Sequence, residues 1–366
     1  MTFFIAVGTL CLICVVLSAL LVVADRFLND YGTCTISING GEKELEVRGG
    51  ASLLSTLVSK RIFIPSACGG GGSCGMCKLK VLRGGGPVLA TEEPLLSDEE
   101  KASNVRLSCQ IKIRENIDIQ IPEEYFRVRE FQGEIEAITP LTHDIRLVRI
   151  KLSEPESIDF TPGAYVQLCA PSYKDSPDPV YRAYSIASDP TDTDHLDLLI
   201  RRVPKGICTT WVFEHLKEGN EVLFNGSHGD FRLSGTDAPM IFIAGGSGMA
   251  PFRSMLLDMR NRGVTRPCRY FFGAVKPRDM FYLEEMKELE VALPDFRFIP
   301  ALGAPEPGDG WDGETGLVTD VVTRHFPDCS GMEAYLCGSP GMINACIKTL
   351  TGNGMPEENI FYDKFA

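Results

Sequence analysis

The sequence predicts a multidomain protein with an N-terminal transmembrane helix, an α+β unit, a small antiparallel β-barrel and a doubly wound α/β unit. Three observations support this fold class. Residues 3–24 contain no charged side chain, short alternating segments fill residues 131–233, and apolar strands alternate with helical segments after residue 238. A chain of 366 residues is long enough for two or three domains that each bury a core.

The uncharged segment "FFIAVGTLCLICVVLSALLVVA" is followed directly by Asp25 and Arg26. As a helix its 22 residues would measure roughly 33 Å, enough to cross a hydrocarbon core of about 30 Å. A cleaved signal peptide is the alternative, but the segment lacks a basic n-region and a short apolar region ending in a cleavage site. We therefore expect a retained single-pass anchor, and Arg26 favours the cytoplasmic side for the residues that follow.

The expected elements of each unit follow from the same patterns. In the α+β unit we expect strands at 33–40, 41–50, 77–85 and 105–122, a helix at 51–62 and an acidic helix or turn at 91–103. The barrel strands are expected at 133–140, 144–152, 164–171, 182–188, 196–203 and 221–231. In the α/β unit we expect strands at 240–246, 268–275, 296–302 and 333–339, with helices at 250–263, 282–293, 317–326 and 341–354.

Composition and motif content exclude several function classes. The net charge of −13 argues against a nucleic-acid partner, because such partners require a cationic surface. The sequence contains neither a G-x-S-x-G elbow nor a G-x-x-x-x-G-K-[ST] loop, which argues against hydrolase and NTPase chemistry. No metal spacing connects the five histidines, which we expect to be surface or core residues: His143, His195, His215, His228 and His325.

The thirteen cysteines include one clustered set in the stretch "ACGGGGSCGMC". Cys68, Cys74 and Cys77 give the pattern C-x5-C-x2-C, and 31 residues separate Cys77 from Cys109. Such thiolate sets bind zinc or an iron–sulfur cluster, and zinc ribbons pair two C-x2-C knuckles where this chain has one. The plant-type ferredoxin spacing C-x4-C-x2-C differs by one residue in its first gap.

The glycines of this stretch fit a tightly curled loop. Gly69 to Gly72 and Gly75 can adopt positive φ and can direct backbone N–H groups toward cluster sulfurs. The sequence therefore predicts a [2Fe–2S] cluster on the four cysteines, with zinc and a flexible glycine linker as alternatives. The remaining cysteines are scattered singly, as in proteins of a reducing compartment.

Two further motifs lie in the barrel region. "RAYS" (182–185) ends an expected strand and matches the R-x-Y-S motif of the ferredoxin–NADP reductase superfamily. "KGICTT" (205–210) places a glycine and a hydroxyl at the start of a helix, where unpaired N–H groups suit a pyrophosphate.

The resemblance to this superfamily implies bound FAD. It assigns Arg182 to the flavin phosphates, Tyr184 to packing on the isoalloxazine ring and Ser185 to the N5 edge. Gly206 and Thr209 would cradle the pyrophosphate.

"MIFIAGGSGMAPF" is an expected strand that enters a glycine turn and a helix. Its pattern, Gly246-x-Gly248-x-x-Pro251, departs from G-x-G-x-x-G in the last position, and proline is compatible with a first helical turn. The same superfamily uses this form to bind a nicotinamide dinucleotide. It also implies that the turn at Cys337 and Gly338 lies where hydride passes between nicotinamide and flavin, although Cys337 could be a small buried residue only.

The choice between NADH and NADPH concerns two cations. Lys276 and Arg278 could reach a 2′-phosphate, but the resemblance favours NADH. It also implies that an aromatic residue of the tail "IFYDKFA" covers the flavin ring, and Phe365 is preferred over Tyr362.

The order of these modules resembles the F subunit of the sodium-translocating NADH:quinone reductases over essentially the whole chain. The resemblance implies a transmembrane helix at 3–24, a [2Fe–2S] ferredoxin-type domain at 32–125, an FAD-binding barrel at 128–235 and an NAD-binding domain at 237–366. It implies hydride transfer from NADH to FAD, with single electrons passing to the cluster and on to other subunits of a membrane complex and its quinone. The protein would lie in the inner membrane with its other domains on the cytoplasmic side.

Three departures distinguish this chain from that pattern. The segment between "RAYS" and "KGICTT" is shorter than the family's usual one, and "GSHGDF" and "CGSP" stand where the family has turns like Gly-Pro-Phe-Gly and Cys-Gly-Pro-Pro. The reductase component of a multicomponent monooxygenase is the alternative enzyme, and the uncharged span argues against it because those reductases are soluble. A redox-sensing or scaffolding protein without turnover is a further alternative.

Overall fold

The computed structural model describes residues 4, 7–8, 11–20 and 31–365. The chain divides into two compact units, one formed by Met1–Ile64 and Gly70–Arg127, the other by Pro65–Gly69 and Val128–Ala366. The expected transmembrane segment 3–24 lies partly outside the described residues; of its described part, 11–20 are helical. Among the residues that are described, no helix combines the length and apolarity needed to span a bilayer.

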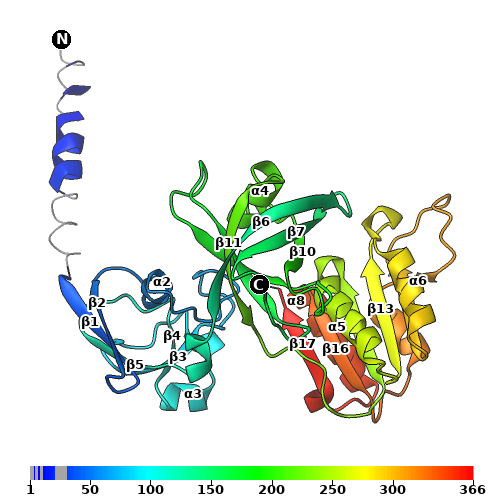
Figure 1. Cartoon of the computed structure of the whole chain (residues 1–366). Coiled ribbons are helices and arrows are strands. Elements are labelled where there is room, and N and C mark those ends of the chain that lie inside the picture. Colours follow the sequence, from blue (N-terminus) through cyan, green and yellow to red (C-terminus); the bar gives the residue numbers. More distant parts are fainter. Residues whose placement is uncertain (1–3, 5–6, 9–10, 21–30, 366) are drawn as a thin grey trace. The chain divides into compact units, whose positions relative to one another are not determined.

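The first unit is built on a five-stranded sheet of order β2-β1-β5-β3-β4 (Figure 1). Strands β1 and β5 are parallel, and the other neighbours are antiparallel. The strands are β1 (Thr33–Ile38), β2 (Lys43–Arg48), β3 (Lys78–Arg83), β4 (Val105–Leu107) and β5 (Ile117–Gln120). The sheet confirms the expected strand regions of the α+β unit, and its alternating isoleucines pack against α2 (Leu53–Ser59) in one core.

Short helical segments of this unit begin at side-chain caps. The Ser52 hydroxyl accepts a hydrogen bond from the Ser55 N–H at the start of α2. In the acidic segment, η1 (Glu93–Leu95) precedes α3 (Asp98–Ala102), whose capping box pairs Ser97 with Glu100. The last described turn of the unit is η2 (Glu123–Phe126).

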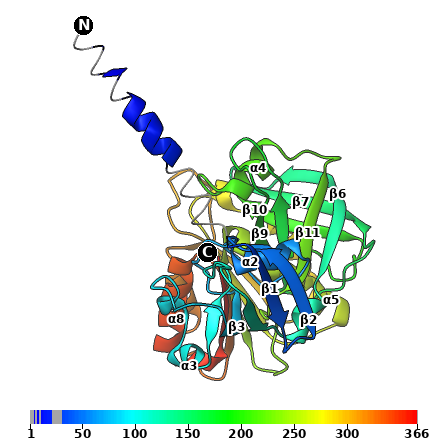
Figure 2. The same ribbon diagram turned by 90° about the vertical axis from the view of Figure 1, so that its left-hand side faces the viewer.

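The second unit contains an antiparallel six-stranded sheet of order β10-β7-β6-β11-β8-β9. Its strands are β6 (Arg129–Pro140), β7 (Ile145–Glu154), β8 (Tyr165–Ala170), β9 (Val180–Ser185), β10 (His195–Arg201) and β11 (Glu221–His228). Its two edges meet at the bridge between Ile186 and Leu198, which curls the sheet into a barrel. Helix α4 (Ile207–Glu214) lies at one end of these strands, and its buried residues join the barrel core (Figures 1 and 2).

A parallel sheet of order β15-β14-β13-β12-β16-β17 follows in the same unit. Its strands are β12 (Met240–Gly245), β13 (Cys268–Ala274), β14 (Phe296–Leu302), β15 (Glu314–Thr315), β16 (Glu333–Gly338) and β17 (Ile360–Lys364). Its helices are α5 (Met249–Arg262), α6 (Leu283–Ala292), α7 (Val318–His325) and α8 (Pro340–Gly352).

The two faces of this sheet have separate cores. Phe242 and Phe272 pack with residues of α5 and α6, whereas Ile243 and Phe271 pack with residues of α7 and α8. Helices therefore cover both faces, which confirms the doubly wound prediction. The chain order reverses between β12 and β16, so the carboxyl ends of these strands form the switch point where such folds bind ligands. Strands β15 and β17 were not predicted.

Candidate functional site

Strand pairing in the first unit brings two of the four predicted cluster ligands together. Cys77 directly precedes β3 and Cys109 follows β4 by one residue, and the two strands pair antiparallel with Lys78 opposite Leu107. The Cys77 carbonyl accepts hydrogen bonds from the Ser108 N–H at 2.9 Å and from the Ser108 hydroxyl at 3.0 Å. This register explains how a predicted ligand 32 residues away in sequence reaches the loop.

The chemistry of the donor set fits an iron–sulfur cluster. A hydrogen bond with Cys109, followed by burial, raises the pKa of the Cys77 thiol, as expected where two thiols lie in contact without a metal. Cys68 and Cys74 are half-buried in the glycine loop. Cys74, Cys77 and Cys109 belong to the first unit, and Cys68 to the segment Pro65–Gly69. The four thiolates are the ligand type that a [2Fe–2S] cluster requires.

The loop glycines adopt the conformation that the sequence predicted at four of five positions. The φ angles are +61° at Gly69, +95° at Gly70, +72° at Gly72 and +70° at Gly75. Gly71 is outside the left-handed region. Such backbone is what a tightly curled loop requires.

The two flavin motifs of the second unit meet in space. Arg182 and Tyr184 are two residues apart on β9 and therefore point to the same face of the sheet. Burial, with the neighbouring thiol of Cys208 in α4, raises the pKa of Tyr184 well above its usual value. Arg182 also acts electrostatically on that thiol. The β9 strand and the N-terminus of α4 thus form one site, as the flavin hypothesis requires.

The loop before α4 is shaped by Gly206 and Thr209. A Cβ at Gly206 would lie 2.6 Å from the Thr209 hydroxyl oxygen, so only glycine fits. That hydroxyl is already bonded to the backbone of Val203, accepting from its N–H and donating to its carbonyl, each at 3.2 Å. We therefore expect Thr209 to serve a pyrophosphate by holding the loop open, while the N–H groups of the first helical turn face the ligand.

The nucleotide motifs meet at the switch point of the parallel sheet. β12 runs into η3 (Gly246–Gly248) and then α5, with Pro251 in its first turn as predicted. A Cβ at Gly248 would lie 2.8 Å from the Cys337 carbonyl carbon and 3.2 Å from Gly338 Cα. The G-x-G-x-x-P turn therefore packs backbone to backbone against the Cys337–Gly338 turn at the end of β16. Gly246 has φ +56°.

Cys337 is fully buried in the parallel-sheet core, and burial, with the carboxyl group of Asp363 nearby, raises its thiol pKa well above the usual value. The Phe365 N–H donates to the Gly338 carbonyl at 3.0 Å, and the Phe365 ring packs on the same core. Tyr362 is 46 % exposed with the Lys364 ammonium over its ring, so Phe365 is the tail aromatic nearer the site.

Asp363 is a residue of this site that sequence reasoning missed. It lies on β17 opposite Cys337, and the Ser185 hydroxyl donates to its Oδ2 at 3.4 Å. Burial raises the pKa of Asp363 despite the opposing hydrogen bond from Ser185. The carboxyl group of Asp363 thus lies beside Ser185, predicted at the flavin N5 edge, and on the strand next to Cys337, predicted beside the nicotinamide. The feature of the sequence that could have identified it is an acidic residue among the aromatic residues of the tail "IFYDKFA".

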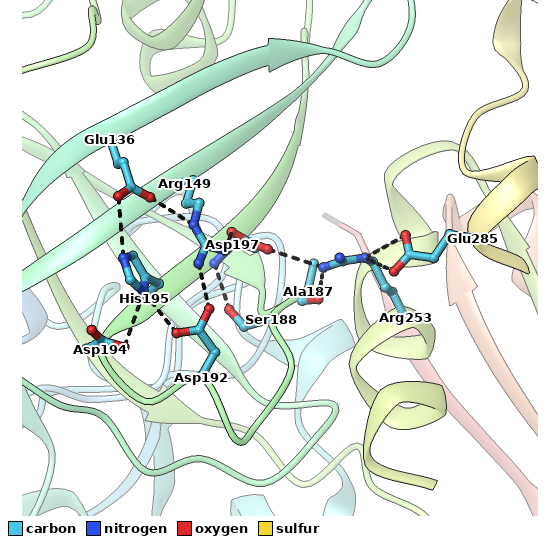
Figure 3. Close-up of polar contacts among 10 residues, drawn as sticks. All are labelled: Glu136, Arg149, Ala187, Ser188, Asp192, Asp194, His195, Asp197, Arg253 and Glu285. Atoms are coloured by element: carbon cyan, nitrogen blue, oxygen red, sulfur yellow. Dashed lines mark hydrogen bonds and ion pairs between the residues drawn. The ribbon is translucent and has the colours of Figure 1, made fainter. Parts of the chain in front are cut away.

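A polar network centred on the buried Asp197 joins the barrel strands to the helices of the parallel sheet (Figure 3). The carboxylate of Asp197 on β10 pairs with Arg149 on β7 at 3.0 Å and with Arg253 on α5 at 3.2 Å. Arg253 also donates to the Ala187 carbonyl at 2.7 Å and pairs with Glu285 at 3.0 Å. Because every charge is paired, the network fixes the strands of the flavin site against those of the nucleotide site.

His195 and His228, two of the five histidines, have different surroundings. His195 lies with Asp192 and Asp194 in a group whose ligand atoms are all within 4.8 Å. His195 is instead an ion-pair partner: burial lowers its pKa, but the hydrogen bond with Asp192 outweighs this and raises the pKa. His228, in "GSHGDF", is buried, which lowers its pKa to about 4.

Three family models match successive parts of the chain. Residues 36–114 match a family model described as a 2Fe-2S iron-sulfur cluster binding domain. Residues 132–233 match an oxidoreductase FAD-binding domain and residues 242–348 an oxidoreductase NAD-binding domain. The protein thus has domains for a [2Fe–2S] cluster, FAD and NAD. These matches favour the cluster over the zinc alternative.

Two solved structures share the architecture. A cytochrome P450 reductase of Amycolatopsis is 29 % identical with a TM-score of 0.73, covering 91 % of this chain and 99 % of its own. The ferredoxin reductase in carbazole 1,9a-dioxygenase is 25 % identical with a TM-score of 0.70, covering 92 % and 99 %.

Curated relatives match over nearly the full length. The F subunit of the Na(+)-translocating NADH-quinone reductase of Pseudomonas paraeruginosa is 36 % identical, covering 99 % of this chain and 98 % of its own. That of Neisseria meningitidis is 36 % identical, covering 97 % of both chains, and that of Actinobacillus succinogenes is 35 % identical, covering 100 % and 99 %. The chain belongs to the family of F subunits of the Na(+)-translocating NADH-quinone reductases.

Proposed function

We propose that this chain is the NADH-oxidising subunit of a membrane NADH:quinone oxidoreductase that translocates sodium. It takes hydride from NADH onto FAD and passes single electrons through a [2Fe–2S] cluster to partner subunits, which deliver them to quinone. When bound, FAD converts a hydride's electron pair into single electrons, which the cluster carries. One observation supports this most strongly: the Gly246–Gly248 turn packs against the Cys337–Gly338 turn at the switch point, with Ser185 and Asp363 beside it.

The protein's own residues supply binding and positioning. Gly248 allows the two turns to approach closely enough for a dinucleotide to cross the strand ends. Arg182 and the first turn of α4 offer positive charge and N–H groups for phosphates, and Tyr184 presents an aromatic face. Ser185 and Asp363 place a hydroxyl and a carboxyl group together, where a proton can be held next to the flavin edge.

NADH is the proposed donor because both candidate cations for a 2′-phosphate already have carboxylate partners. The Lys276 ammonium pairs with Glu306 at 2.5 Å and the Arg278 guanidinium with Asp279 at 3.8 Å. A phosphate would have to displace these partners. The monooxygenase-reductase alternative shares the soluble modules, but the uncharged stretch 3–24 gives this chain the means to join a membrane complex.

We further propose that residues 3–24 anchor the protein in the inner membrane, with the catalytic domains on the cytoplasmic side where NADH is available. The test is isolation of the full-length chain from membranes in mild detergent, followed by assay of NADH oxidation with ferricyanide and with quinone. The expected result is co-isolation with multi-span subunits and sodium-stimulated quinone reduction. A lone polypeptide that reduces ferricyanide but no quinone would contradict the assignment to such a complex.

A further inference from the structure

Cys109, the most distant predicted cluster ligand, receives a hydrogen bond from its neighbour in sequence. The side-chain amide nitrogen of Gln110 lies 3.4 Å from Cys109 Sγ and donates to it. This contact lies wholly within the first unit. Cys109 is half-buried, so the bond lies in partly desolvated surroundings, where it is stronger than in water.

The orientation of the Gln110 amide is fixed from two sides. Its oxygen accepts a hydrogen bond from the Thr91 hydroxyl at 2.9 Å, which leaves the nitrogen to face the sulfur. On the other side, a Cβ at Gly72 would lie 2.5 Å from the amide nitrogen and 3.0 Å from the amide carbon. Gly72 therefore provides the space that the amide fills, and any other residue there would displace Gln110.

Thr91 is in turn held by a buried ion pair. Its neighbour Glu92 has no exposed surface and makes two bonds with the Arg106 guanidinium, Oε1 to Nε at 2.9 Å and Oε2 to Nη2 at 2.6 Å. Glu92 also accepts a hydrogen bond from the Leu107 N–H at 2.9 Å. Because Arg106 and Leu107 belong to the strand that leads to Cys109, the ion pair couples the position of Thr91 to that of the ligand.

We propose that Gln110 is a positioning residue that raises the reduction potential of the [2Fe–2S] cluster through its N–H···S bond to Cys109, with Thr91 setting the amide's orientation. This deepens the proposed function, since it rests on Cys109 being a cluster ligand. Adding an electron to the cluster increases the negative charge on its thiolates, so a donor to a thiolate favours the reduced state. The effect makes the cluster a better acceptor for electrons from NADH.

The test compares full-length variants in detergent. Gln110→Met keeps the length of the side chain and removes the donor, Gln110→Glu keeps the shape and replaces the donor with an acceptor, and Thr91→Val keeps the amide but removes its anchor. Gln120→Met, at the exposed end of β5, is the matched control. Iron and acid-labile sulfide are assayed first, and the midpoint potential is then measured by EPR-monitored titration with chemical mediators.

We expect Gln110→Met to lower the equilibrium constant for cluster reduction up to about tenfold, or about 59 mV for one electron. Gln110→Glu should lower it further, Thr91→Val less, and Gln120→Met not at all. A fully loaded Gln110→Met or Gln110→Glu protein with the wild-type potential would overturn the proposal. Loss of the cluster in both would also overturn it, in favour of a role in assembly. Chemical mediators replace NADH in this titration, so the measured potential does not depend on NADH oxidation. A failure of NADH oxidation would therefore contradict the proposed function without changing this test of Gln110.

Discussion

Gly248→Ala is the most informative single substitution at the nucleotide site. The added Cβ would lie 2.8 Å from the carbonyl carbon of Cys337 and 3.2 Å from Gly338 Cα, whereas non-bonded carbon atoms pack at about 3.5–4.0 Å. The two turns must therefore separate by roughly 0.5–1 Å. Crowding of this kind costs about 1–3 kcal/mol of stability. A displacement near 1 Å at a reacting centre can lower a rate by about 100-fold.

The assay is rapid mixing of the full-length protein with NADH, following flavin reduction, together with thermal unfolding. We expect a large loss in the rate of flavin reduction and a lower unfolding temperature, while the cluster content is unchanged. Gly352→Ala is the control, because no atom lies within 4 Å of the Cβ position at the end of α8. Wild-type rate and stability in Gly248→Ala would refute the argument that this close approach builds the site.

Three further predictions concern other parts of the site. Cys109→Ala should leave flavin reduction by NADH nearly intact and abolish delivery to one-electron partners, and equal loss of both steps would contradict the serial order. Asp363→Asn should be more stable than wild type at pH 8, and the difference should shrink toward pH 4. The reason is that the raised pKa of Asp363 makes its ionised form destabilising in the folded protein. A pH-independent difference in unfolding temperature would count against this. Glu333 has its pKa lowered to about 2 by hydrogen bonds, chiefly from Ser234, that outweigh its burial. Glu333→Gln should therefore lose about 3 kcal/mol of stability at pH 7. This loss should fade as the pH falls from 4.5 toward 2. Equal stability of the two proteins at pH 7 would contradict this prediction.

Local patterns were sufficient to predict most of the fold. Regular short strands with turn signals indicate the barrel sheet, and buried runs such as "MIFIAGG" indicate a parallel sheet that is covered on both faces. The four cysteines could be singled out because thiolate chemistry and spacing are specific, and their role as cluster ligands stays a prediction. Gly248 was predictable as a motif residue, although its reason, the Cys337 backbone, became visible only in three dimensions.

Features set by long-range pairing could not be predicted. β17 was missed because its pairing with β16 supplies the stabilisation that its mixed sequence "IFYDK" does not indicate. The same pairing places Asp363 beside Ser185, a contact that spans 178 residues of sequence. The Asp197 network likewise depends on which strands are neighbours.

We propose that Cys68, Cys74, Cys77 and Cys109 hold a [2Fe–2S] cluster that receives electrons from NADH through the flavin. The most direct measurement is low-temperature EPR of the full-length protein after anaerobic reduction by NADH, with iron and sulfide analysis of the same sample. We expect about two irons and two sulfides per chain, with a rhombic signal that is absent in Cys109→Ala. Bound zinc, or a reduced flavin without any paramagnetic cluster signal, would contradict it.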